Sequence, residues 1–269
     1  MTNKTSQKFS RPELSPTGCF ERKIFMAKGI LVSVSYGASD ETLAADIGRI
    51  ESALQDAMPG WELRRAFTSP LVRARLAKQG KEVPDAAGAI AQARADGAER
   101  IAVAALLVSP GGEFESVEAA SQDLHVITPL LADDVDLDTL AGYFGEVQRK
   151  NGRSLVLMGH GSPTSGNPAY ARLRERLPEN VYLACLSDHD NLAWLMPELL
   201  RHSEREITLM PLLMSVGGHT LKDMAGDGGD SWKSQLEKAG FKVECRLTGI
   251  GRLDVVQSIF VRKAKKIVG

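Results

Sequence analysis

Short apolar runs alternate with amphipathic stretches from residue 28 onward, and this alternation constrains the fold more than any other feature. The run 29–36 (GILVSVSY) is typical of a strand, and the next segment carries Ile47, Ile50 and Leu54 at helical spacing. The run 101–108 (IAVAALLV) is apolar throughout, which predicts burial on both faces of a sheet. Further strands are expected at 61–67, 154–158, 181–186, 207–214 and 242–247. Strands that alternate with helices indicate an α/β protein with parallel sheets.

The chain also contains an internal repeat. ERIAVAALLVSPGGE (99–113) and REITLMPLLMSVGGH (205–219) share Ile, Leu, Leu, Ser, Gly and Gly at matching places. LVSVSYGAS (31–39) and LVLMGHGSP (155–163) share Leu, Val and a loop glycine. We therefore expect two similar doubly wound, Rossmann-like halves that face a central cleft, although short apolar strands can also agree by chance.

The expected division of the chain follows from this repeat. Residues 28–135 form the N-terminal half, and residues 136–269 form the C-terminal half with the histidines of interest. Residues 1–27 are rich in Ser, Thr, Lys and Pro and show neither a helical nor a strand period. We expect this segment to be a disordered extension.

Charge and cysteine content exclude several classes of protein. The 33 Lys and Arg residues balance 34 Asp and Glu residues, so there is no basic field for nucleic acid. No segment reaches the roughly 18 apolar residues that a membrane span needs, and the N-terminus lacks the apolar stretch of a signal peptide. Cys19, Cys185 and Cys245 are too scattered for a CxxC metal site or a disulfide framework. We expect a cytoplasmic protein, and the oligomeric state stays open.

Four residues fall at the carboxyl ends of predicted strands, where ligands bind in such sheets: Tyr36, Glu113, His160 and His219. His160 stands between two glycines in GHGS, and His219 follows a strand and two glycines. Neutral imidazole binds Co²⁺, Ni²⁺, Fe²⁺ and Zn²⁺ and can act as a base near neutral pH. We favour a site shared by the two histidines over two packed histidines. By contrast, His125, in a segment expected to be helical, and His202, at a helix end, are interpreted as structural.

Other segments carry weaker signals. Asp188 and His189 follow the strand at 181–186 and could complete a His/His/carboxylate set, but Asp188 is equally well placed to cap a helix that begins near Asn191. The segment 222–233 (KDMAGDGGDSWK) is expected to be a polar lid, with Asp230 or Ser231 capping the next helix. Neither a P-loop nor a serine-hydrolase elbow is present.

Four segments together resemble a known family in their order and spacing. They are SYGAS (35–39), RAFTS (65–69), MGHGS (158–162) and MPLLMSVGGHTLKDMAGDGGDSWK (210–233). From about Gly29 onward the chain resembles the anaerobic, ATP-independent sirohydrochlorin cobaltochelatases of cobalamin biosynthesis. The resemblance implies two Rossmann-like halves around a tetrapyrrole cleft. It also implies that His160 and His219 bind the metal.

Two positions depart from the family pattern. The third metal ligand of the family is a glutamate, and Leu186 stands at that position here. Leu107 stands where relatives often have a histidine in the first half, although Glu113 is kept. Asp188 and His189 are the nearest candidates to replace the missing ligand.

The resemblance implies a lyase that inserts a divalent metal, Co²⁺ by expectation, into sirohydrochlorin. His160 would be base and metal ligand, His219 a metal ligand, and Glu113 a proton acceptor. The substrate-binding residues expected for the carboxylate-rich macrocycle are Tyr36, Arg65, Thr68 and Lys222. Two alternatives stay open: a tetrapyrrole or metal carrier without turnover, and a chelatase for Fe²⁺ or Ni²⁺.

Overall fold

The computed structural model describes residues 29–38, 41–162, 168–187 and 189–268. The predicted extension therefore lies outside the described residues. Among the helices of the described part, none is long and apolar enough to cross a lipid bilayer.

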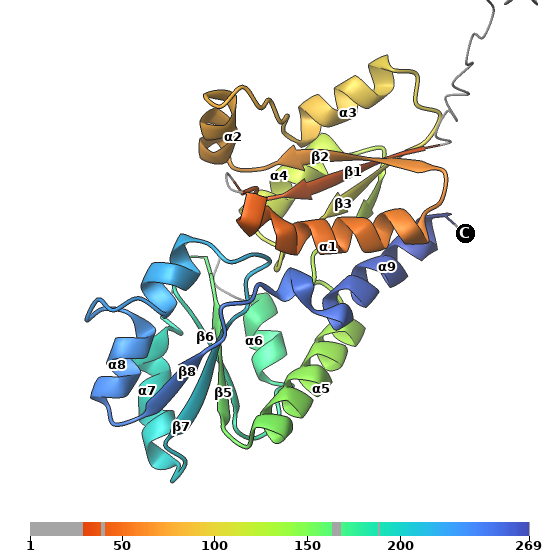
Figure 1. Ribbon diagram of the computed structural model, residues 1–269. Coiled ribbons are helices and arrows are strands. Elements are labelled where there is room, and N and C mark those ends of the chain that lie inside the picture. The colour runs from red at the N-terminus through yellow and green to blue at the C-terminus, as the bar shows by residue number, and fades with distance from the viewer. Residues whose placement is uncertain (1–28, 39–40, 163–167, 188, 269) are drawn as a thin grey trace, which may run out of the picture.

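The first sheet is parallel and has the strand order β2-β1-β3-β4 (Figure 1). Its strands and the helices between them are β1 (Gly29–Ser35), α1 (Glu41–Ala57), β2 (Trp61–Phe67), α2 (Pro70–Ala77), α3 (Ala86–Ala95), β3 (Ile101–Ala105), α4 (Gly112–Ala120) and β4 (His125–Ile127).

The second sheet is also parallel and has the order β6-β5-β7-β8. The remaining elements are α5 (Asp134–Asn151), β5 (Ser154–Gly159), α6 (Pro168–Arg174), β6 (Val181–Cys185), α7 (Leu192–Arg201), β7 (Glu206–Pro211), the π-helix η1 (His219–Met224), α8 (Trp232–Lys238), β8 (Lys242–Cys245), the 3₁₀ helix η2 (Ile250–Arg252) and α9 (Asp254–Val268). The two sheets thus repeat one strand order, with β1 matching β5 and β3 matching β7. This confirms the predicted α/β fold with two similar halves.

The central strands are buried on both faces, as their continuous apolar runs predict. One face of β1 packs Ile30, Val32 and Val34 against α3 and α4. The opposite face joins a larger cluster that includes Leu31 of β1 and Leu157 of β5. This cluster is shared by the two sheets, so one continuous core holds the halves together.

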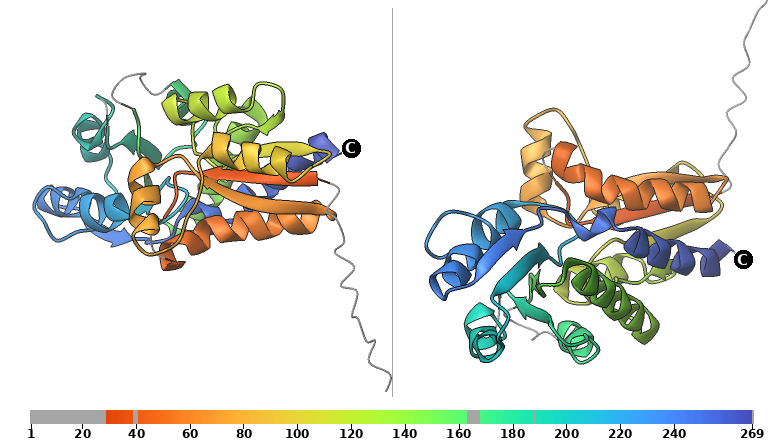
Figure 2. Two further views of the ribbon diagram at one scale, coloured as in Figure 1. Left: turned by 90° about the horizontal axis from the view of Figure 1, so that it is seen from above. Right: turned by 60° about the horizontal axis from the view of Figure 1, so that its bottom comes forward.

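Helix α9 returns from the second half and packs along α1 of the first half (Figures 1 and 2). Its residues Val256, Ile259 and Phe260 are buried in the shared cluster with Ile50 and Leu54 of α1. The expected boundary between residues 135 and 136 stays a prediction. Helix α9 follows that boundary in sequence but packs against α1, which precedes it.

Some local predictions were wrong. His125 lies in the short edge strand β4, where it pairs with Ala102 of β3, and not in a helix. Hydrogen bonding to the buried strand β3 decides the conformation of this segment. A segment of three residues is too short for its apolar pattern to distinguish a strand from a helix. The segment at 222–233 begins inside the π-helix η1, and its end confirms Ser231 as the cap of α8, since its hydroxyl accepts from the Ser234 amide.

Candidate active site

His160 lies on the loop that follows β5, and other residues of the second half pack tightly against the start of this loop. β5 ends at Gly159, where an added Cβ would lie 2.7 Å from the Tyr170 ring, so only glycine fits. Burial raises the pKa of Tyr170 to about 12, while the Ser109 hydroxyl and the backbone of Gly161 and His160 oppose that rise. The Tyr170 hydroxyl therefore lies beneath the histidine loop and next to Ser109 of the first half.

The His160 ring is oriented by its own loop. Its Nδ1 lies 2.8 Å from the Gly161 carbonyl oxygen. Because a carbonyl only accepts hydrogen bonds, this contact places the imidazole proton on Nδ1. The other nitrogen, Nε2, then keeps its lone pair for a metal or a proton.

His219 is the first residue of the π-helix η1, and its ring is oriented by a carboxylate one turn later. Its Nδ1 lies 2.6 Å from Asp223 Oδ2. An acceptor on Nδ1 again fixes the proton there and makes Nε2 a better donor of its lone pair. Asp223 is a positioning residue that the sequence reasoning missed. Its spacing of four residues from His219, within one helical turn, is the signal that could have revealed it.

The two histidines lie against each other. Their ring centroids are 4.9 Å apart, with 78° between the ring planes. In the described part of the chain, no three His, Cys, Asp or Glu side chains form a group suited to a metal ion. Within the described residues, the pair therefore places two imidazole rings side by side.

Glu113 approaches this pair from the first half. It stands in the first turn of α4, at the place that His219 occupies in the repeat. Glu113 is exposed to solvent as a residue, but partial desolvation of its carboxyl raises the pKa, while the hydroxyl of Thr68 and the charge of His160 oppose that rise. The buried Thr68 hydroxyl faces the carboxyl without the full geometry of a hydrogen bond. Glu113 is thus a carboxyl that holds a proton more readily than usual, close to His160.

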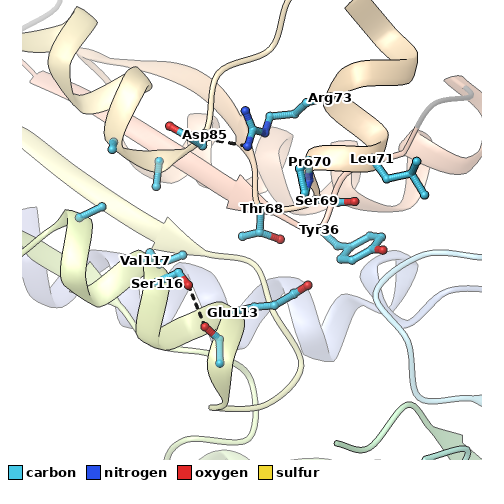
Figure 3. A pocket seen from close by; sticks show the side chains of 14 residues that line it. Tyr36, Thr68, Ser69, Pro70, Leu71, Arg73, Asp85, Glu113, Ser116 and Val117 are labelled. Carbon is cyan, nitrogen blue, oxygen red and sulfur yellow. Dashed lines mark hydrogen bonds and ion pairs between the residues drawn. The ribbon is translucent and has the colours of Figure 1, made fainter.

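A pocket of about 650 Å³ opens beside Glu113 (Figure 3). Tyr36 directly follows β1 and Thr68 directly follows β2, so the pocket lies at the carboxyl ends of these strands. Figure 3 shows Tyr36, Thr68 and Glu113 turned toward the same space. Every described residue that lines the pocket belongs to the first half.

Arg73 of α2 also lines the pocket, and the sequence reasoning missed it. Its guanidinium nitrogen Nη2 lies 3.5 Å from Asp85 Oδ2, a long ion pair, and its buried Nε has no hydrogen-bond partner. Asp85 uses its other oxygen, Oδ1, to cap α3 by accepting from the Gly88 amide at 2.9 Å. Arg73 therefore lines the pocket with a guanidinium group whose Nε has no partner in the protein.

Two predicted substrate anchors lie elsewhere. Arg65 turns toward α1 and pairs with the buried carboxylate of Glu51 at 2.5 Å, which also accepts from the Ser33 hydroxyl at 2.9 Å. Lys222 is exposed on η1 and is not part of the pocket lining. The structure does not bring either side chain to the pocket.

The position of the missing family glutamate is next to His160. The amides of Leu186 and Ser187 donate to the carbonyl oxygens of Gly159 and His160, each at 2.9 Å. A longer polar side chain at Leu186 would therefore start beside the imidazole. Leu107 is buried in the apolar cluster on the outer face of the first sheet.

The nearby candidates for a replacement ligand are only partly described. His189 is exposed, and Asp188 lies outside the described residues. The helix that Asp188 was thought to cap is capped instead by Asn191, whose side chain accepts from the amides of Ala193 and Trp194. His202 is the C-terminal cap of α7, as expected from its place at a helix end.

Comparison with known proteins agrees with the geometry of the site. Two curated relatives carry the same activity in their names. The chain is 30% identical over 230 residues to sirohydrochlorin cobaltochelatase CbiKC of Nitratidesulfovibrio vulgaris, which covers 80% of this chain and 81% of the relative. It is 29% identical over 252 residues to the sirohydrochlorin cobaltochelatase of Salmonella typhimurium, which covers 88% of this chain and 94% of the relative.

Structural and family comparisons complete these findings. A solved structure that superposes on the chain is the bifunctional 5,10-methylenetetrahydrofolate dehydrogenase/cyclohydrolase from Thermoplasma acidophilum. The match covers 89% of this chain and 90% of the other, at 11% identity and a TM-score of 0.39. The model of the family described as cobalt chelatase (CbiK) matches residues 28–269. The chain therefore belongs to the cobalt chelatase (CbiK) family.

Proposed function

We propose that the protein inserts Co²⁺ into sirohydrochlorin, as the names of its relatives indicate for them. We also propose that insertion needs no ATP, which the lack of a P-loop motif in the sequence supports. The observation that carries the proposal is the contact between His160 and His219, whose Nδ1 atoms are both engaged and whose Nε2 atoms are both left for a ligand. The raised pKa of Glu113 next to this pair adds a proton-accepting group from the other half.

The chemistry of insertion requires a metal to be delivered and two protons to be removed. Two pyrrole N–H bonds break, their protons leave, and the freed nitrogens bond to the divalent metal. The His160 and His219 imidazoles would hold Co²⁺, the metal substrate, through Nε2, and His160 would accept a proton when it releases the metal. Glu113 would accept the second proton, for which a raised pKa is suited. Metal–nitrogen bonding supplies the driving free energy.

The pocket of the first half would hold the macrocycle. Tyr36 and Leu71 offer exposed apolar surface for its rings, and their side chains are 53% and 67% exposed. Thr68 and Arg73 offer polar donors, and Arg73 suits a substrate carboxylate because its guanidinium can donate two hydrogen bonds to one carboxylate. Arg73 takes the anchoring role that Arg65 was expected to have.

The choice of metal is a finer part of the proposal. Imidazole sites follow the general affinity order of divalent metals, so Fe²⁺ and Ni²⁺ are the alternatives to Co²⁺. We propose that water or substrate nitrogens complete the coordination where Leu186 replaces the family glutamate. His189 or Asp188 as a third ligand is the competing proposal.

Cytoplasmic location and assembly are expectations of the same kind. In the described part of the chain neither Cys185 nor Cys245 forms a disulfide, a state typical of a reducing compartment. A homo-oligomer stays open, and size-exclusion chromatography with light scattering would measure it.

The decisive experiment is a matrix of Co²⁺, Ni²⁺ and Fe²⁺ against sirohydrochlorin under anaerobic conditions. Absorption spectra follow the metal product in each reaction, and the enzyme-free rate is the baseline. Acceleration with Co²⁺ supports the chelatase. Binding of sirohydrochlorin without acceleration by any metal would instead identify a carrier.

A further inference from the structure

Asp46 of α1 extends from the first half into the loop that carries His219. Its side chain is only 3% exposed, and its Oδ2 accepts from the backbone amide of Val216 at 3.1 Å. Its Oδ1 accepts from Nε of Arg252, which belongs to η2. Val216 stands three residues before His219, so one carboxylate of the first half contacts the backbone that leads into the second histidine.

The same loop is held from its other side by η2 and the residue before it. The amides of Ile250 and Gly251 donate to the carbonyls of Leu213 and Met214 at 2.9 and 3.0 Å. A Cβ added to Gly249 would lie 2.3 Å from Asp46 Oδ2 and 2.6 Å from the Met214 carbonyl oxygen. Asp46, the 249–251 segment and the loop after β7 are therefore packed without free space.

We propose that Asp46 is a positioning residue that fixes the loop before η1, so that His219 faces His160. The proposal goes beyond the proposed function, because it concerns what aligns the two imidazoles and holds for any metal they bind. The Val216 amide is partly buried and needs an acceptor, and Asp46 supplies that acceptor from the opposite half. The alignment of His160 and His219 then depends on contact between the two halves and not on the second half alone.

A second buried aspartate, Asp136, is the control that separates an effect on the position of His219 from a general loss of stability. Asp136 of α5 is 0% exposed and is ion-paired with Arg262 and Lys263 of α9. Like Asp46, it is a buried carboxylate that joins elements distant in sequence, but neither the pocket lining nor the histidine loops include it. Its loss should lower stability, because Arg262 loses its carboxylate partner and the buried Lys263 keeps only Asp133 as an ion-pair partner among the described residues.

The experiment compares Asp46→Ala, Asp46→Asn and Asp136→Ala in the full chain, well below the melting temperature of each. Asp46→Ala is expected to weaken Co²⁺ binding and lower kcat by about ten-fold, the equivalent of one lost charge-assisted hydrogen bond. KM for sirohydrochlorin should change by less than about two-fold, because neither Asp46 nor the loop that it contacts lines the pocket. Asp46→Asn keeps an acceptor for the Val216 amide and should recover most of the loss. Asp136→Ala should lower the melting temperature and leave Co²⁺ affinity unchanged.

A double-mutant cycle decides whether Asp46 acts through His219. Co²⁺ affinity is measured by calorimetry for Asp46→Ala in the parent and in the His219→Ala background. Asp46→Ala should have no further effect once His219 is absent, because residues that act as a unit are not additive. Asp46→Ser, whose shorter side chain should no longer reach the Val216 amide, takes its place in the cycle if Asp46→Ala does not fold.

Three results would overturn the proposal: additive losses in the cycle, a rise in KM with kcat unchanged, or equal Co²⁺ losses in Asp46→Ala and Asp136→Ala. The calorimetric cycle needs no turnover, so it tests Asp46 even if the protein proves to be a carrier. Failure of the proposed function would show as absent insertion by the parent protein, with the cycle unaffected.

Discussion

The two halves share one strand order but place different chemistry at equivalent points. Tyr36 follows β1 where His160 follows β5, and Glu113 opens α4 where His219 opens η1. The first half thus combines a pocket with a protonatable carboxyl, while the second half presents two imidazoles. The comparison teaches that a repeated scaffold fixes where side chains emerge and leaves open what they do. The proposed function therefore predicts that substrate binding and metal binding can be changed separately.

The sharpest way to test this division is to remove the imidazoles. His160→Ala and His219→Ala should each lower the insertion rate by at least about a hundred-fold, as expected for loss of a base and metal ligand. The double variant should be little worse than the worse single variant, because both act on one metal. Steady-state insertion assays with Co²⁺ and sirohydrochlorin measure these rates.

His202→Ala is the control for the imidazole variants, since His202 caps α7 and contacts Tyr182 with ring centroids 5.8 Å apart, away from both histidine loops. It should leave the rate nearly unchanged. Losses at His160 and His219 that simply multiply would rule out a shared site.

Glu113→Gln tests the contribution of the first half to the same chemistry. The change keeps the shape of the side chain and removes its ability to take a proton, so the rate should fall by roughly ten- to a hundred-fold. Co²⁺ affinity measured by calorimetry should stay close to that of the parent, because Glu113 belongs to the first half and the two imidazoles proposed to bind Co²⁺ belong to the second. A large loss of Co²⁺ affinity would contradict the division and make Glu113 a metal ligand.

Arg73→Ala tests the pocket as the place where the macrocycle is held. Removing a charged donor to a substrate carboxylate should raise KM for sirohydrochlorin about ten-fold with little change in kcat. Arg65→Ala is the matched control, because Arg65 pairs with Glu51 and is absent from the pocket lining. If only Arg65→Ala raised KM, the anchor first expected from the sequence would be reinstated.

Leu186→Glu gives the second half the glutamate that the family resemblance implies at this position. Its backbone runs beside His160, so the new carboxylate should raise Co²⁺ affinity by roughly five-fold, the gain being partly offset by the cost of burying a charge. Calorimetry with the variant and with His189→Ala measures both proposals. A parent-like affinity in Leu186→Glu together with a strong loss in His189→Ala would identify His189 as the present ligand.

Much of this arrangement could be predicted from the sequence. Continuous apolar runs predicted buried parallel strands, and Gly-His after matching strands predicted that His160 and His219 would meet. What escaped prediction depends on contacts distant in sequence. The sequence does not distinguish Arg65 from Arg73, because both are arginines near apolar and basic residues. Only the folded structure shows that Arg65 pairs with Glu51 and that Arg73 lines the pocket. The role of Asp46 depends on the return of the chain at η2, which no local pattern encodes.

The return of α9 to α1 also sets the order in which the protein can be completed during synthesis. A ribosome finishes the first sheet and α1 long before residues 254–268 emerge, and domains otherwise tend to fold as they are made. Until then the apolar stripe of α1 with Ile50 and Leu54 lacks the cover that Ile259 and Phe260 provide. The first half therefore spends translation with an open apolar face, which is a natural target for chaperones. A chain that ended before residue 254 would keep that apolar face of α1 exposed.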